Sequence, residues 1–407
     1  MPRVLLLIPT RTYRTHDFIT AARRLGIAVV VGSPHRPALA HLMDGGHLRV
    51  DFQAIDESVA RIVDFASRLP LAGVVAVDDS GTRLASAAAE RLSLPHNPLP
   101  AVIAASSKLL TRNALARAGL PTPGYESFPI DIDPLTVAST IRYPCVVKPL
   151  DLSGSQGVIR ANDAEDFPHV FSRVAAIASS CGRAGKETSL LVEDFVPGRE
   201  VALEGLLRNG RLEVLAIFDK PNPLDGPFFE ETIYVTPSRL PPLEQAAIIQ
   251  SVALATQALG LREGPVHAEL RVNDRGVFLL EVAPRSIGGL CSRTLRFGAG
   301  LSLEELILRH ATGLAMPEHA REPQAAGVMM LPIAQAGRLR EVRGQKEAAR
   351  VPGIDGLVLT VPAGERLVPL PEGDRYLGFV FARSAEPAAV EASLREALGR
   401  LTVLTDD

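Results

Sequence analysis

The chain has 407 residues, of which 46% are hydrophobic and 22% charged, and its formal net charge is −3. This composition is ordinary for a globular protein, and the length predicts two or three domains. The balanced charge excludes the global basic bias that is typical of nucleic-acid or anionic-membrane binding. The three cysteines form no CxxC pair, which disfavours a disulfide framework or a zinc site. We expect a cytoplasmic protein with no nucleic-acid and no membrane partner.

The first hundred residues alternate between apolar strands and helices. Strands are predicted at 4–8, 28–31 and 73–77, and helices at 17–25, 58–68 and 82–92. Continuous apolar strands separated by helices predict a parallel sheet covered on both faces. Asp78, Asp79, Ser80 and Gly81 follow the third strand, where such sheets gather ligands, although these residues also suit a helix N-cap. Three prolines then indicate a boundary, so we predict an N-terminal α/β domain over 1–98.

The pattern beyond residue 98 is α+β in character, with shorter strands and more turns. Helices are expected at 106–118, 241–259 and 387–398, and strands at 144–149, 157–161, 190–195, 199–208, 212–219, 267–272, 277–282, 328–332, 357–361 and 376–382. Asn209-Gly210 is typical of a hairpin turn. We predict a central domain over 99–315, with a glycine-rich subdomain at about 120–190, and a smaller α+β domain over 316–407.

A small-residue loop follows Lys148 at the end of a predicted strand. It contains Ser153, Gly154, Ser155 and Gly157. Small residues let backbone N–H groups approach phosphate oxygens, and a lysine at the root supplies a positive charge. A glycine-rich hairpin without a ligand remains the alternative. Further on, the strand that ends in Glu193 and Phe195 could line an adenine pocket or be an ordinary edge strand.

Two carboxylates occupy neighbouring strands of the hairpin at 267–282. A four-residue turn pairs the strands and brings Glu269 and Glu281 close together. Two adjacent carboxylates repel unless a cation lies between them, and Mg²⁺ suits two carboxylates plus phosphate oxygens. A pair of solvated carboxylates is the alternative, but the apolar neighbours disfavour it.

Arg285 follows Glu281 by four residues, before Gly288 and Gly289. A guanidinium at this position could bind a phosphoryl group or a carboxylate bidentately. The alternative is a structural arginine paired with one of the many acids.

Taken in order, these motifs resemble the ATP-grasp superfamily. The resemblance implies phosphate binding by Lys108, Lys148, Ser153, Gly154, Ser155 and Gly157, adenine binding at Glu193, Phe195 and Val196, ribose binding by Glu200, and Mg²⁺ (or Mn²⁺) binding by Glu269 and Glu281. It also implies three parts: a preceding parallel α/β domain, a central ATP-grasp domain with a glycine-rich lid, and a C-terminal α+β domain.

Within the superfamily the chain looks most like the L-amino-acid ligases. The motif from Glu281 to Arg285 and the C-terminal segment carry this likeness. It implies catalytic roles for Arg285, Gly288 and Gly289, and a substrate site with Lys220, Glu231, Tyr234 and His267. Ala283 stands where many relatives have Asn, and Tyr234 where some have His.

The resemblance implies an ATP-dependent ligase that joins a carboxylate and an amine, with amino acids as substrates, through an acyl phosphate. A homodimer is also expected, since many relatives are dimers. The alternatives are another ATP-grasp ligase or carboxylase of the purine or biotin type, and a non-catalytic ATP-binding regulator.

Overall fold

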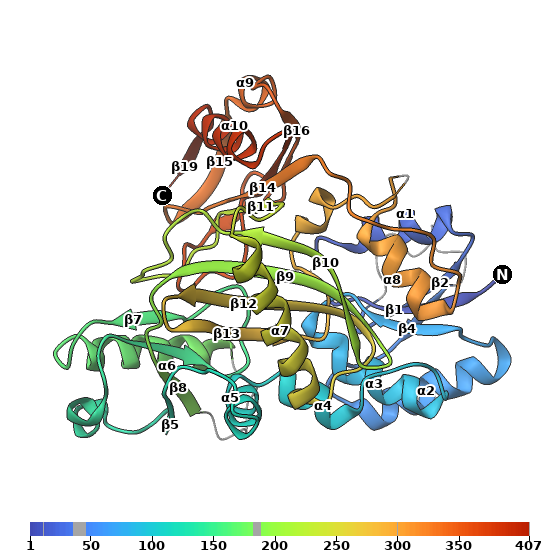
Figure 1. Cartoon of the computed structure of the whole chain (residues 1–407), viewed down its shortest axis with the longest axis horizontal. Coiled ribbons are helices and arrows are strands. Elements are labelled where there is room, and N and C mark those ends of the chain that lie inside the picture. The colour runs from blue at the N-terminus through green and yellow to red at the C-terminus, as the bar shows by residue number, and fades with distance from the viewer. Residues whose placement is uncertain (11, 36–45, 182–188, 299, 407) are drawn as a thin grey trace.

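A computed structural model gives the structure of the chain, and it describes every residue except 11, 36–45, 182–188, 299 and 407. The described residues form four sheets (Figure 1). The multidomain fold class predicted from the sequence, with a parallel N-terminal sheet and α+β regions after it, is confirmed.

The N-terminal sheet is parallel throughout, in the order β3-β2-β1-β4. Its strands are β1 (Arg3–Leu7), β2 (Ala28–Ser33), β3 (His47–Arg49) and β4 (Gly73–Ala76), and its helices are α1 (Thr15–Arg24), α2 (Ile55–Arg68) and α3 (Thr82–Arg91). Alternate β1 side chains face opposite sides. Leu6 packs in the same cluster as Phe18 of α1, whereas Leu5 packs with Ile62 of α2. Helices therefore cover both faces, as the sequence predicts.

The region predicted as a lid, at about 120–190, contains a four-stranded antiparallel sheet in the order β5-β8-β6-β7, and we refer to this region as the lid. Its strands are β5 (Tyr125–Pro129), β6 (Cys145–Pro149), β7 (Ile159–Ala161) and β8 (Ser189–Asp194), and α6 (Phe167–Cys181) packs against it. Two helices precede it, α4 (Leu99–Ala105) and α5 (Lys108–Arg117). The sequence predicted α5 but neither α4 nor α6.

An eight-stranded antiparallel sheet forms the centre of the molecule, in the order β13-β12-β9-β10-β11-β14-β18-β16. Its strands are β9 (Arg199–Arg208), β10 (Arg211–Asp219), β11 (Ile233–Thr236), β12 (Gly264–Asn273), β13 (Gly276–Ala283), β14 (Ala325–Leu331), β16 (Ile354–Leu359) and β18 (Gly378–Ser384). Helix α7 (Pro242–Leu259) crosses one face (Figure 1). β11 pairs with β14, so this sheet runs across the predicted boundary at 315.

The remaining elements complete the C-terminal part. They are α8 (Leu303–Thr312), β15 (Gly337–Arg343), α9 (Gln345–Ala348), β17 (Arg366–Leu367), α10 (Pro387–Gly399) and β19 (Thr402–Asp406), with 3₁₀ turns at Asp79–Gly81, Pro134–Thr136, Ala138–Thr140 and Cys291–Thr294. A separate three-stranded sheet is formed by β17, β15 and β19, in that order. Helix α10 packs on β14 and β18, which anchors this part to the central sheet.

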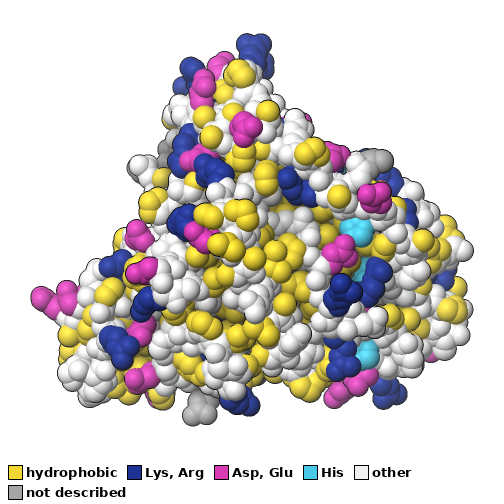
Figure 2. Space-filling model, in the orientation of Figure 1, with side chains coloured by type: hydrophobic (Ala, Val, Ile, Leu, Met, Phe, Trp, Pro, Cys, Tyr) yellow, Lys and Arg dark blue, Asp and Glu magenta, His cyan; other side chains and the backbone are white. Residues whose placement is uncertain are grey.

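The outward side of α7 is apolar. Leu243 is 86% exposed, Leu254 42% and Ile249 38%, and the single charged residue of the helix, Glu244, contacts Arg199. Figure 2 shows apolar side chains gathered over the middle of this face. Even so, no helix in the described part of the chain is both long and apolar enough to cross a membrane. The homodimer and the cytoplasmic location stay predictions.

Candidate active site

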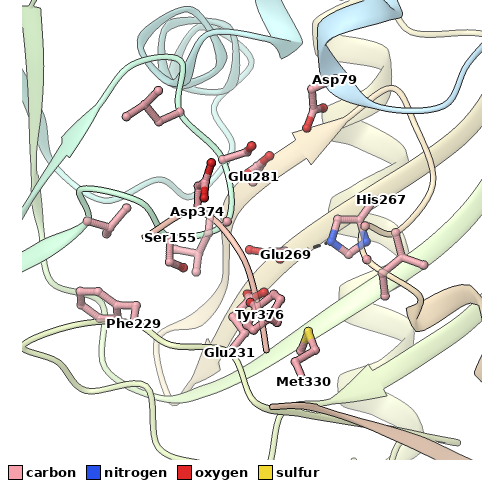
Figure 3. A pocket seen from close by; sticks show the side chains of 18 of the residues that line it. Asp79, Ser155, Phe229, Glu231, His267, Glu269, Glu281, Met330, Asp374 and Tyr376 are labelled. Atoms are coloured by element: carbon pink, nitrogen blue, oxygen red, sulfur yellow. Dashed lines mark hydrogen bonds and ion pairs between the residues drawn. The ribbon is translucent and has the colours of Figure 1, made fainter. Parts of the chain in front are cut away.

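A cavity of about 790 Å³ opens where the N-terminal sheet, the lid, the central sheet and the C-terminal part meet. Side chains from all four regions line it, among them Asp79, Ser155, Glu269 and Tyr376 (Figure 3). Every residue predicted to bind nucleotide, metal or substrate lines this cavity except Gly157 and Lys220. The structure thus brings together motifs that lie more than a hundred residues apart.

Lys148 and Glu193 face each other at the lid end, on the paired strands β6 and β8. The Lys148 ammonium contacts Glu193 Oε2, and Arg112 Nε lies 2.7 Å from Glu193 Oε1. Burial would raise the pKa of Glu193, but Arg112 and then Lys148 outweigh it and lower that pKa. Burial is also the main reason that the pKa of Lys148 is lowered, against the opposing effect of Glu193. Glu193 therefore remains ionised and holds two cations.

The glycine-rich loop is tied at both ends. At its root, Lys108 Nζ donates to the Leu152 carbonyl oxygen at 2.6 Å. Gly157 has a φ of +70°, and a Cβ there would lie 2.9 Å from the Pro149 ring, so the turn favours glycine. The amide of Gly157 donates to the Pro371 carbonyl oxygen at 2.9 Å. That amide is therefore directed to the C-terminal part, while Ser153, Gly154 and Ser155 line the cavity.

The predicted adenine and ribose residues lie beside Arg271. Its guanidinium carbon is 5.1 Å from the centre of the Phe195 ring, and its Nη1 donates to the Val196 carbonyl oxygen at 2.7 Å. Its Nε lies 2.9 Å from Glu200 Oε2, while Lys220 Nζ lies 2.8 Å from Glu200 Oε1. Both oxygens of Glu200 are thus paired with cations, and Phe195 is left as an apolar wall.

Lys220 is the centre of the opposite end of the cavity. Its ammonium contacts Glu231, lies 3.2 Å from Glu269 Oε1 and sits 5.0 Å from the centre of the Tyr234 ring. Carboxylate oxygens of Glu200, Glu231 and Glu269 come close enough together to hold a metal ion. The Lys220 ammonium contacts all three carboxylates and so occupies the place that a shared ion would take. We therefore do not place a metal among these three residues.

Glu231 and Glu269 have opposite pKa shifts. Burial and then the Glu269 carboxylate raise the pKa of Glu231 to about 7, against the opposing effect of Lys220. Burial would raise the pKa of Glu269 as well, but Lys220 and His267 outweigh it and hold that pKa well below its usual range. The Tyr234 hydroxyl donates to Glu231 Oε2 at 2.9 Å.

His267 lies between two acids. Its Nδ1 is 2.5 Å from Glu204 Oε1, and its Nε2 is 3.2 Å from Glu269 Oε1. Burial opposes its charge, but hydrogen bonds to Glu204 and Glu269 raise the pKa of His267 to about 9. A protonated His267 therefore adds a second positive charge beside Glu269.

Glu269 and Glu281 are direct partners in the pairing of β12 with β13, as the hairpin predicts. The Glu281 side chain is 30% exposed, and its closest cation, Arg285 Nη2, is 3.9 Å away. The partly exposed carboxylate of Glu281, beside that of Glu269 on the paired strand, offers oxygen ligands of the kind that Mg²⁺ prefers. The residues therefore fit the predicted ion, with Glu281 as the more available ligand.

Arg285 is held by an acid from the N-terminal domain. Its Nε and Nη2 lie 2.9 and 3.0 Å from the two oxygens of Asp79, and its Nη1 donates to the Ser286 carbonyl oxygen at 3.2 Å. Burial would raise the pKa of Asp79, but Arg285 lowers it. Gly289 follows with a φ of +60°, where a Cβ would lie 2.8 Å from the Phe379 ring. The cavity wall beside Arg285 therefore has no room for a side chain at position 289.

Family comparisons agree with this arrangement. Residues 19–96 match the ATP-grasp N-terminal domain, residues 141–294 the ATP-grasp domain, and residues 329–406 the L-amino acid ligase C-terminal domain 2. The D-alanine–D-alanine ligase of Methylibium petroleiphilum is 30% identical over 56% of this chain and 74% of its own length. The chain belongs to the ATP-grasp superfamily.

Two further comparisons show a likeness to amino-acid ligases of that superfamily. The alanine–anticapsin ligase of Bacillus subtilis is 26% identical over 62% of this chain. The chain spans about half of that relative, 56% of its length. The crystal structure of an L-amino acid ligase from Bacillus licheniformis has the same fold, with a TM-score of 0.85 and 24% identity over 100% of this chain and 99% of that one. The superfamily and the likeness to L-amino-acid ligases, both predicted from the sequence, are confirmed.

The ATP-grasp motifs did not reveal every residue of the site. The sequence indicates Asp79 only as part of a strand-end motif, and it assigns no role to Arg112 or Tyr376. Tyr13 was not predicted either; its ring centre lies 5.2 Å from that of Phe379, so the first and last parts of the chain meet at the cavity. The acidic strand end was a signal for Asp79, whereas no motif pointed to the two tyrosines.

Proposed function

We propose that this chain joins the carboxylate of one small molecule to the amine of another by using ATP, and that at least one of them is an amino acid. One observation carries the proposal. A single cavity has the two lysines Lys108 and Lys148 at one end, and the partly buried acid Glu231 beside Lys220 at the other. The first end suits phosphates and the second suits the ammonium group of an amino acid.

The reaction needs an activated carboxylate, because delocalised negative charge makes a carboxylate carbon a poor electrophile. An oxygen of the substrate carboxylate attacks the γ-phosphorus of ATP, the bond to the β-phosphate oxygen breaks, and ADP leaves. The amine nitrogen then attacks the acyl carbon, loses a proton, and inorganic phosphate leaves as the amide forms. Positioning and charge neutralisation dominate catalysis of the first step.

The lysines at the lid end would act in that first step. Lys148 is nine-tenths buried, so its charge is little screened by water and acts strongly on a phosphate. Lys108 holds the loop by its bond to Leu152 and lines the same cavity. Glu269 and Glu281 would hold Mg²⁺, or Mn²⁺ in its place, and the ion would supply further neutralisation of phosphate charge.

Arg285 would stabilise negative charge on the reacting acyl group. A guanidinium has five N–H donors. Three contacts to Asp79 and Ser286 position it, and donors remain for a substrate oxygen. Gly288 and Gly289 line the cavity beside it, where their lack of side chains leaves room for a reacting group. Asp79 thereby serves as the anchor of a catalytic guanidinium.

The substrate ammonium would bind at Glu231, with Tyr234, Lys220 and His267 around it. The Tyr234 hydroxyl already donates to Glu231 and fixes the orientation of the carboxylate. Lys220 and His267 balance the charge of Glu269. Glu231 is the acid whose charge changes near neutral pH, because its pKa is raised to about 7. An incoming ammonium would complete this balance.

The test is a screen of amino-acid pairs with the full chain, ATP and Mg²⁺. Phosphate release is measured for each pair, and mass spectrometry identifies the condensed product. We expect release to depend on both partners and a product whose mass equals their sum minus one water. Phosphate release without any condensed product, or indifference to every amino acid, would contradict the proposal.

A further inference from the structure

A buried cluster of three charged residues borders the lid end of the cavity, and one of its members has no assigned role. Arg112 and Lys148 share the single carboxylate of Glu193. The side chains of Arg112 and Glu193 are 0% and 3% exposed, and that of Lys148 is 9% exposed. Two cations and one anion leave one positive charge in excess, which is costly in a buried site unless an anion binds.

The geometry of Arg112 fixes the orientation of Glu193. Arg112 Nε and Nη2 lie 2.7 and 3.3 Å from the two carboxylate oxygens, and Nη2 also donates to the Leu280 carbonyl oxygen at 2.9 Å. A planar fork of this kind holds a carboxylate in one orientation. Lys148 is then limited to Glu193 Oε2, and its other N–H donors are left to face the cavity.

Arg112 also joins elements that separately carry the nucleotide residues. It lies one turn after Lys108 on α5, contacts Glu193 on β8, and reaches the carbonyl of Leu280, which precedes Glu281 on β13. Its Nη1 is buried and finds no hydrogen-bond partner among the residues that the structure describes; the same holds for Nε of Arg14.

The chain contains a matched pair elsewhere. Arg14 is 1% exposed, its Nη2 lies 3.3 Å from Glu304 Oε1, and its Nη1 donates to the Val77 carbonyl oxygen. This pair joins the start of α1 to α8. It includes no lysine, and neither Arg14 nor Glu304 lines the cavity. The two arginines are thus similar in burial and pairing but differ in their relation to the proposed ATP site.

We propose that Arg112 is a positioning residue for ATP, which holds Glu193 so that Lys148 presents its ammonium to the phosphates and the cluster keeps its excess positive charge. This inference rests on the proposed use of ATP. Without Arg112, both oxygens of Glu193 compete for Lys148 and the cluster becomes neutral. ATP affinity then falls, whereas the amino-acid end of the cavity is unaffected.

The experiment measures ATP binding by calorimetry, with Mg²⁺ present, for the full chain and three variants. Arg112→Met should weaken ATP binding by about tenfold or more, since a buried charge-assisted contact is lost. Arg112→Met combined with Glu193→Gln restores a net charge of +1 on Lys148 and should regain much of the loss. Arg14→Met is the control: it should lower the thermal midpoint similarly but leave ATP affinity within about twofold.

Unchanged ATP affinity in Arg112→Met, equal weakening in Arg14→Met, or a double variant no better than the single one would each overturn the inference. If Arg112→Met does not fold, Arg112→Lys takes its place, because it keeps the charge but loses the fork; wild-type ATP affinity in that variant overturns the inference. An unaltered chain that binds no ATP would overturn the proposed function itself, so the two failures are distinguishable.

Discussion

The two ends of the cavity balance their buried charges in different ways. At the lid end, two cations share the carboxylate of Glu193. At the other end, the carboxylates of Glu200, Glu231 and Glu269 share the ammonium of Lys220. Arg271 also pairs with Glu200 and His267 with Glu269, so among the described residues Glu231 is the acid of this group that has Lys220 as its only cation. One end therefore has a cation to offer a phosphate, and the other has the Glu231 carboxylate to offer an ammonium. If the proposed function holds, this difference would orient the nucleotide and the amino acid in one cavity.

The largest expected effect comes from removing the cation at the acidic end. Lys220→Met leaves three neighbouring carboxylates without their shared ammonium, so we expect the free energy of unfolding to fall by about 3–5 kcal/mol. The loss should shrink as the pH is lowered, because protonation relieves the repulsion. Chemical denaturation at two pH values measures both effects. The exposed Lys346→Met is the control, and equal stability of the two variants would break the comparison.

Next in size is the loss of the proposed metal ligand between the two ends. Glu281→Gln removes a half-open carboxylate, so we expect kcat to fall by at least about a hundredfold while the fold persists. Phosphate-release kinetics and circular dichroism test this. Glu341→Gln, on β15 and outside the cavity, is the matched control. Near-normal turnover of Glu281→Gln would contradict the proposed role of Glu281 as a metal ligand.

The pH dependence of amino-acid affinity should show whether Glu231 is the acid that binds the substrate ammonium. The pKa of Glu231 is raised to about 7, so at lower pH this carboxyl is neutral and binds an ammonium weakly. In metal-free buffer, amino-acid affinity should rise by up to about tenfold per pH unit below 7 and level off above it. Binding at pH 6.5 should release a proton, which calorimetry in buffers of different ionisation enthalpy detects. Glu231→Gln should abolish both effects, and a flat profile in the unaltered chain would argue against Glu231.

The raised pKa of Glu231 also makes the free energy of unfolding depend on pH. The unfolded state ionises Glu231 near its ordinary pKa of 4.5, whereas the folded state keeps the proton to about 7. Between these values the folded state binds more protons, so this residue lowers the free energy of unfolding as the pH rises.

The smallest effect concerns a contact between the lid and the C-terminal part. Arg173 Nε and Nη2 lie 2.7 and 3.1 Å from the two oxygens of Glu372, whose carbonyl accepts from Gln156 of the loop at 2.8 Å. Both side chains are nearly half exposed, so Glu372→Ala should change stability by less than about 1 kcal/mol. We expect water to reach the acyl phosphate more often, with a few-fold rise in ATP hydrolysis per product formed. Asp64→Ala, which breaks the exposed pair with Arg68, is the control and should leave that ratio unchanged.

Much of this comparison could be predicted from local sequence. Lys148 and its loop, the hinge at Glu193 and the hairpin carrying Glu269 and Glu281 are each contained in a short stretch, so periodicity and turn residues suffice. The pairing of Arg285 with Asp79 spans 206 residues, and that of Arg112 with Glu193 spans 81. Such pairs depend on how separate elements pack. Because the chain has many arginines, the sequence alone does not indicate which of them will contact a given acid. The sequence therefore predicts the functional groups better than their partners.

The secondary structure shows the same limit. Helix α8 has a capping box of Ser302 and Glu305, a local signal that could have predicted it. Helix α6 was missed because its surroundings consist of short strands and turns. Strand β11 has only four residues and joins β10 to β14, and nothing in so short a stretch indicates which strands it will pair with.

The pairing of β11 with β14 has a practical consequence for engineering this protein. Because the central sheet continues through β14, β18 and β16, a truncation at 315 would leave β11 as a bare edge strand and remove Tyr376 from the cavity wall. Bare edges are prone to aggregation. The C-terminal part is therefore unsuitable as an exchangeable module; a chimera that aims to change substrate choice would have to graft β11 and its three outer neighbours as one unit.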